Sequence, residues 1–119
     1  MLYVAGRVGH GWDQLGKRTS DEDYFALLRS LKRRPVDYFK MFYADTAQFG
    51  SLASTKCGLD FFGVDHVLFA SDCPFEPQPG IYIRETLQVM RGLELPEADL
   101  AKICHGNAMR LIPNLKLES

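Results

Sequence analysis

The chain has 119 residues, 46% of them hydrophobic and 24% charged, and its 15 acidic and 14 basic side chains leave a formal charge of −1. This composition excludes an intrinsically disordered chain and gives no electrostatic reason to expect nucleic acid or a membrane surface as a partner. No run reaches the ~20 apolar residues of a membrane span, and three cysteines without C-x-x-C spacing indicate reduced thiols, so we expect one cytoplasmic domain.

The first half of the chain is predicted to contain an opening loop, two helices and a strand. Four glycines and weak periodicity in residues 1–19 indicate irregular backbone. Ser20 can cap a helix over 21–33, where apolar residues recur at helical spacing. A proline in the first turn favours a short helix over 35–40, and the aromatic residues within 41–46 indicate a strand.

The second half is predicted to contain a further strand among helices. Residues 51–62 have helical spacing and a glycine follows them, which is typical of a helix end. Residues 66–71 form a short apolar run without alternation, the pattern of a strand in a parallel sheet covered on both faces. Helices are expected over 81–93, 97–103 and 107–112.

Two strands joined by a helix within about 30 residues form a β-α-β unit, which predicts an α/β fold. Two strands alone leave two sheet edges and a bare face, whereas parallel sheets occur buried on both faces. We therefore expect the chain to be part of a larger sheet, completed by another copy or by residues that it lacks.

Aspartates follow both predicted strands, at the position where α/β folds place functional side chains. Asp72 ends the run V-L-F-A-S-D, and its carboxylate can bind a divalent metal or accept a proton. The alternative is an aspartate that caps a turn or the next helix, and strand and turn pattern alone favours it. Asp45 follows the first strand, and turn capping is at least as good an interpretation there.

Other reactive side chains form no recognised motif. His10, His66 and His105 are far apart in the sequence, and we expect packing or structural roles for the first two and a capping role for His105 at the break between two helices. A Cys73 nucleophile paired with His66 lacks an oxyanion motif. The basic cluster of Arg29 and residues 32–34 can contact phosphate, but cations at a helix C-terminus are ordinary dipole complementation.

Four segments together carry a family resemblance. They are G-R-V-G-H-G-W-D, R-P-V-D-Y-F-K-M-F-Y-A-D-T-A, G-V-D-H-V-L-F-A-S-D-C-P-F and I-C-H-G-N-A-M-R-L-I. The chain resembles the C-terminal third of the amidohydrolase superfamily branch that contains metal-dependent decarboxylases of aromatic and muconate-type carboxylic acids. Within the branch it is most similar to γ-resorcylate decarboxylase-like enzymes, with aminocarboxymuconate-semialdehyde decarboxylase-like enzymes beside them.

The resemblance implies a partial (β/α)8 barrel, with the last two βα units and the C-terminal helices in one incomplete domain, residues 1–119. The strand ending at Asp72 would be the eighth and the strand ending near Asp45 the seventh. Asp72 matches a ligand of the family's divalent ion, zinc or manganese. Arg7 matches an arginine that contacts the substrate's carboxylate or ring hydroxyl.

The resemblance covers one metal ligand, whereas a catalytic site needs about three protein ligands. We therefore expect a fragment of a decarboxylase for an aromatic or muconate-type acid, inactive and without stably bound metal by itself, and homo-oligomeric. A metal-dependent hydrolase fragment of the same superfamily and a non-catalytic oligomeric module are the alternatives.

Overall fold

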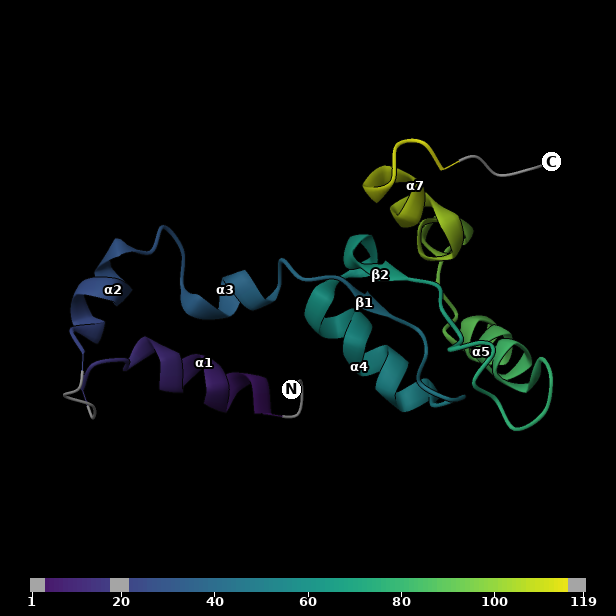
Figure 1. Ribbon diagram of the computed structural model, residues 1–119, viewed down its shortest axis with the longest axis horizontal. Helices are drawn as coiled ribbons and strands as arrows, with labels where there is room; N and C mark the ends of the chain where they lie inside the picture. Colours follow the sequence, from purple (N-terminus) through teal and green to yellow (C-terminus); the bar gives the residue numbers. More distant parts are fainter. Residues whose placement is uncertain (1–3, 18–21, 116–119) are drawn as a thin grey trace. The chain divides into compact units, whose positions relative to one another are not determined.

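The structure is a computed structural model that describes residues 4–17 and 22–115 (Figure 1). Its residues cluster into two units, Met1–Phe42 and Tyr43–Ser119, and each unit is described by itself. No helix in these two stretches is long and apolar enough to cross a membrane. The expectation of one domain over residues 1–119 stays a prediction.

The first unit begins with a helix where the glycines predicted a loop. Helix α1 spans Ala5–Asp13 and contacts helix α3, Pro35–Phe39. The loop prediction is wrong for residues 5–13, because each glycine costs a helix only about 1 kcal/mol and packing offsets that cost. Gly9 is buried with Val36 beside it, and the rings of Trp12 and Phe39 lie 6.1 Å apart between centroids.

The predicted helix over 21–33 is shorter in the structure. Helix α2 spans Tyr24–Ser30, and the Asp23 carboxylate caps it by accepting a hydrogen bond from the Ala26 amide at 2.9 Å. The predicted cap, Ser20, lies outside the described residues. The prediction of a short helix opened by Pro35 is confirmed by α3.

The second unit contains the predicted β-α-β arrangement. Strand β1, Ala44–Asp45, pairs in parallel with β2, Val67–Leu68, and helix α4, Leu52–Phe62, connects them through a 3-10 turn, η2, Val64–His66 (Figure 1). Ala44 aligns with Val67. The parallel pair and its helical crossover confirm the α/β class.

Both strands are shorter than predicted because other bonds replace the sheet ladder. Before β1, the Met41 and Phe42 amides close turns at the end of α3, bonding to carbonyls of Tyr38 and Phe39. After the paired residues, the Thr46 carbonyl accepts a hydrogen bond from the Gln48 amide at 2.7 Å, and the Ala70 amide donates to the Thr46 hydroxyl at 3.0 Å. The ladder between the two strands therefore ends at the hydrogen bond from the Thr46 amide to the Leu68 carbonyl.

The last helices form one continuous segment. These are α6, Glu97–Ala101, a π-helical turn, η3, Lys102–Gly106, and α7, Asn107–Leu111. The separate helix α5 before them spans Ile81–Gly92, within one residue of its predicted bounds. The predicted break and capping role of His105 are wrong. Gly106 keeps helical angles, φ −59 and ψ −42, so the wider π turn carries the chain through without a cap.

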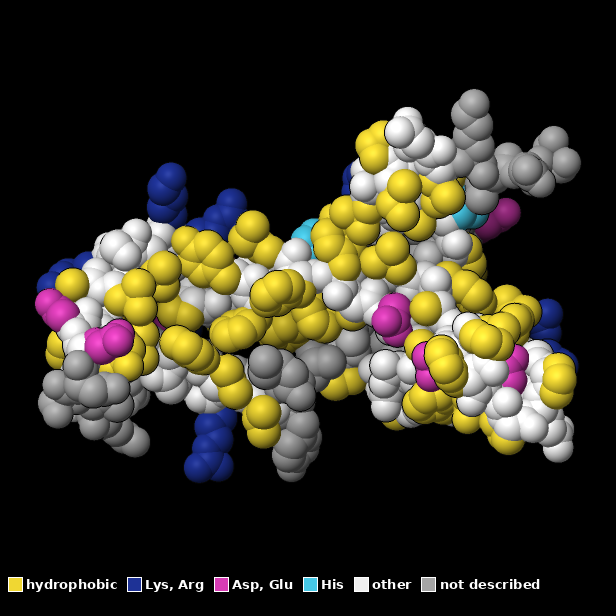
Figure 2. Space-filling view, in the orientation of Figure 1, with side chains coloured by type: hydrophobic (Ala, Val, Ile, Leu, Met, Phe, Trp, Pro, Cys, Tyr) yellow, Lys and Arg dark blue, Asp and Glu magenta, His cyan; other side chains and the backbone are white. Residues whose placement is uncertain are grey.

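The core of the second unit joins β2 to the helices. Val67, Met90, Leu93 and Ile103 are buried together, and Ile103 has no exposed surface. Other large apolar side chains stay exposed, and Figure 2 shows hydrophobic side chains over α5 and α7. The exposed set in these two helices comprises Ile83, Leu87, Met109 and Leu111.

Helix α4 has a side-chain cap that can be tested. The Ser51 hydroxyl accepts a hydrogen bond from the Ser54 amide at 3.3 Å. Ser51→Ala is expected to lower the free energy of unfolding by about 1 kcal/mol, because an amide of the first turn loses its acceptor. Urea denaturation followed by circular dichroism measures the loss. Ser54→Ala is the control: it removes the hydrogen bond between the Ser51 and Ser54 hydroxyls but leaves the cap acceptor in place. Equal effects of both variants would contradict the capping role.

Candidate functional site

The predicted metal ligand lies in the turn that follows β2. Asp72 is exposed and has φ 64, in the left-handed region that aspartate tolerates better than most residues. Its carbonyl accepts a hydrogen bond from the Phe75 amide at 3.0 Å. The chain thus turns at Asp72, and the turn places a carboxylate at the surface just beyond the strand's carboxyl end.

The aspartate after the first strand has the turn-capping role. The Asp45 carboxylate accepts a hydrogen bond from the Ala47 amide at 2.9 Å. Next to it, Thr46 is 2% exposed, and its hydroxyl bonds to both the amide and the carbonyl of Ala70. The alternative weighed for Asp45 is therefore confirmed, and Thr46 is a site residue that sequence reasoning missed.

Asn107, at the start of α7, anchors β2 and the turn before it to the C-terminal helices. The Asn107 amide group donates to the carbonyls of Val64 and Val67, both at 2.8 Å, and Asn107 is 1% exposed. Its own carbonyl oxygen is buried without a hydrogen-bond partner among the described residues. Sequence reasoning placed Asn107 only at a helix start, and no sequence signal indicated a link to a strand 40 residues earlier.

The turn after Asp72 contains a thiol and a carboxylate. The Glu76 carboxylate accepts a hydrogen bond from the Gly80 amide at 2.8 Å, and this bond contributes most to holding the pKa of Glu76 below its ordinary value. Desolvation, followed by the charge of Glu76, raises the pKa of the Cys73 thiol. A protonated thiol is a weak nucleophile, so these neighbours disfavour the Cys73 interpretation.

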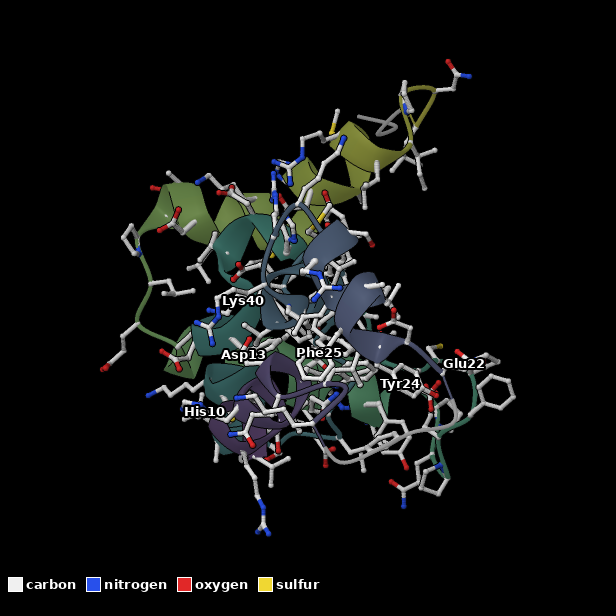
Figure 3. The ribbon with its side chains drawn as sticks, turned by 90° about the vertical axis from the view of Figure 1, so that its left-hand side faces the viewer. His10, Asp13, Glu22, Tyr24, Phe25 and Lys40 are labelled. Carbon is white, nitrogen blue, oxygen red and sulfur yellow. The ribbon has the colours of Figure 1, made fainter. Side chains whose placement is uncertain are left out.

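The three histidines lie on three different elements. His66 stacks on Tyr43 with ring centroids 4.5 Å apart and planes at 11°, which agrees with a structural role. His105 is exposed on η3. His10, labelled in Figure 3, is exposed on α1 in the first unit. In residues 4–17 and 22–115, no three His, Cys, Asp or Glu side chains are grouped so that they could hold a metal ion.

The donor set determines how far these residues fit a divalent ion. Asp72 offers a hard oxygen donor of the kind that manganese, magnesium and zinc accept. A catalytic centre takes about three protein ligands. Asp72 therefore fits the ion as one ligand, and the residues that the structure describes do not form a complete metal centre.

The predicted substrate contact belongs to the first unit. Arg7 lies on α1 and is exposed. Nearby in sequence, Asp13 accepts hydrogen bonds from the Arg34 guanidinium, which holds the pKa of Asp13 below its ordinary value. Figure 3 marks Asp13 on α1. One of the basic residues considered for phosphate contact is thus engaged by a carboxylate.

Comparisons with known proteins agree with one another. Residues 8–113 match a family model described as Amidohydrolase. The chain is 36% identical over 81 residues to the 6-methylsalicylic acid decarboxylase of Penicillium expansum, an alignment that covers 68% of this chain and 24% of that protein.

Solved structures give the same picture. One is a dihydroxybenzoic acid decarboxylase from a Polaromonas species with bound manganese and the inhibitor 2-nitroresorcinol. It is 26% identical with a TM-score of 0.66, over 98% of this chain and 31% of that one. The 2,6-dihydroxybenzoate decarboxylase from Rhizobium is 26% identical with a TM-score of 0.62, over 92% and 30%. The chain thus spans under a third of the length of these relatives.

Proposed function

This chain belongs to the amidohydrolase family, and we propose that it forms part of a metal-dependent enzyme that removes CO₂ non-oxidatively from an aromatic carboxylic acid. The observation that carries this proposal is the likeness, along nearly the whole chain, to proteins that are aromatic acid decarboxylases. It is joined to the position of Asp72 in the turn that follows β2, four residues after Leu68.

In this proposal Asp72 is one ligand of a divalent ion, manganese or zinc. Its support is an exposed carboxylate at the carboxyl end of a parallel strand. The bound ion would supply charge stabilisation and orientation for the substrate anion. The chain's own contribution is to hold one oxygen donor in a turn fixed on both sides, by Thr46 at Ala70 and by the Phe75 amide.

Arg7 is proposed to bind the substrate's carboxylate or a ring hydroxyl. An arginine suits this role because its planar guanidinium can donate two parallel hydrogen bonds to a carboxylate. Its exposure on α1 leaves the group accessible to a ligand in the first unit. Recognition of the acid and ligation of the metal are thereby assigned to different residues of the chain.

We further propose that the chain, residues 1–119, is one incomplete cytoplasmic domain of a (β/α)8 barrel, completed by further protein such as another copy. The support is that residues 4–17 and 22–115 contain one β-α-β unit, with exposed apolar side chains that include Phe75 at 80% and Ile83 at 37%. The polypeptide alone is expected to lack decarboxylase activity, since Asp72 is its single assigned ligand.

Manganese titration of the purified chain tests the role of Asp72. In ¹⁵N NMR spectra, Mn²⁺ is expected to broaden the amide signals of Asp72, Cys73 and Phe75 selectively, and Asp72→Asn is expected to abolish that effect. Asparagine tolerates the left-handed backbone, so the variant removes charge with little strain. Asp45→Asn is the matched control and should retain the broadening.

One result would count against the metal role of Asp72, and another against the proposed inactivity of the chain alone. Unchanged broadening in Asp72→Asn would show that the carboxylate is no ligand. Incubation of the chain with Mn²⁺ and 2,6-dihydroxybenzoate, followed by chromatography, is expected to yield no resorcinol. Product formation would contradict the proposal that the chain is inactive by itself.

A further inference from the structure

The end of β1 shows an exchange of hydrogen-bond acceptors. The Thr46 amide still donates to the Leu68 carbonyl at 3.0 Å, as a parallel ladder requires. The ladder would next bring the Ala70 amide to the Thr46 carbonyl. That carbonyl instead accepts from the Gln48 amide at 2.7 Å, because the chain turns away after β1.

The Thr46 hydroxyl takes the place of the diverted carbonyl. It accepts a hydrogen bond from the Ala70 amide at 3.0 Å and donates one to the Ala70 carbonyl at 2.8 Å. One side chain thus holds both polar backbone groups of a single residue. Thr46 is 2% exposed, so water does not readily replace these bonds.

Hydrogen bonds also hold the backbone on either side of Ala70, up to Asp72. The Phe69 amide is held by the Ile103 carbonyl at 2.9 Å, and the next residue, Ala70, is held by Thr46. Only Ser71 then separates Ala70 from Asp72, whose carbonyl is held by the Phe75 amide.

We infer that Thr46 is a positioning residue for Asp72: its hydroxyl fixes the backbone of Ala70 and thereby the left-handed conformation that presents the Asp72 carboxylate. The backbone part of this inference stands on the hydrogen bonds alone. The use of the carboxylate as a metal ligand rests on the proposed function. A valine at position 46, just after β1, would have nearly the same shape as threonine, so the hydroxyl is the feature that requires an explanation.

The test compares Thr46→Val, which keeps the shape and removes the hydroxyl, with Thr46→Ser, which keeps the hydroxyl. In Thr46→Val we expect the Ala70 amide to exchange with solvent at least about tenfold faster. The three-bond coupling that reports φ of Asp72 should move toward the value of extended backbone. The Mn²⁺ concentration that half-broadens the Asp72 signal should rise about tenfold. Thr46→Ser should restore all three values.

If Thr46 only stabilises the fold and does not position Asp72, the data will differ, and that result would overturn the inference. Exchange would then rise uniformly, at Val67 and Met90 as much as at Ala70, while the Asp72 coupling stayed unchanged in the folded protein. Failure of Thr46→Ser to restore the coupling would also overturn it. If Thr46→Val does not fold, Thr46→Cys replaces it, with intermediate exchange at Ala70 expected and unchanged exchange overturning the inference.

The same data separate this inference from the proposed function. If Mn²⁺ broadening persists in Asp72→Asn, the metal role of Asp72 fails. The Ala70 exchange and the Asp72 coupling need no metal, so they still decide whether Thr46 positions that residue.

Discussion

Replacement of Ile103 by alanine is expected to lower the free energy of unfolding of the second unit by about 2 to 5 kcal/mol. Ile103 has no exposed surface and packs with Val67, Met90 and Leu93. The substitution removes buried methyl and methylene groups and leaves a cavity between β2 and the helices. Urea denaturation followed by far-ultraviolet circular dichroism measures the loss.

The matched control is Ile112→Ala, in the same C-terminal segment. Ile112 is 54% exposed, so its truncation should change stability by less than about 0.5 kcal/mol. Equal effects of the two substitutions would show that Ile103 does not occupy the centre of the core.

Asn107→Ala is the second substitution with a large expected effect, a loss of about 2 to 4 kcal/mol in the free energy of unfolding. The variant removes both hydrogen bonds from the Asn107 amide group and leaves the carbonyls of Val64 and Val67 without that donor. Buried polar groups without partners cost more than the lost bonds are worth in water. Urea denaturation again gives the value.

Asn114→Ala controls for the loss of an asparagine. Asn114 is exposed near the end of the described residues, and its truncation should be nearly neutral. A loss below about 0.5 kcal/mol for Asn107→Ala would mean that the two carbonyls find other partners readily. The anchoring of β2 by the C-terminal helices would then be refuted.

Local sequence signals were sufficient for several helices. Helix α4 has its serine cap at Ser51 and its terminating Gly63, whose φ of 78 suits glycine. Helix α5 begins and ends within one residue of its predicted bounds. These signals act between residues four or fewer positions apart, so they can be read along the chain.

The same local reading failed where packing outweighed propensity. The glycines of α1 indicated a loop, yet Trp12 against Phe39 and Gly9 beside Val36 accompany a helix there. The break predicted at His105 is absent, since the π turn continues the helix. Both errors came from assigning a fixed meaning to glycine, whose conformation depends on what surrounds it.

Part of the candidate site could be predicted from the sequence, and part could not. The position of Asp72 after a buried strand could be read from V-L-F-A-S-D, and the family resemblance was readable from motifs spread along the chain. The roles of Thr46 and Asn107 could not, because their partners lie 24 and 40 residues away in the sequence.

The sequence by itself thus determined the α/β class, the parallel pair and the carboxylate after its second strand, because burial pattern and turn residues are local properties. The tertiary structure alone decided how far each strand runs and which side chains hold its end. Those outcomes depend on hydrogen-bond partners that become neighbours only when the distant segments of the second unit have packed together.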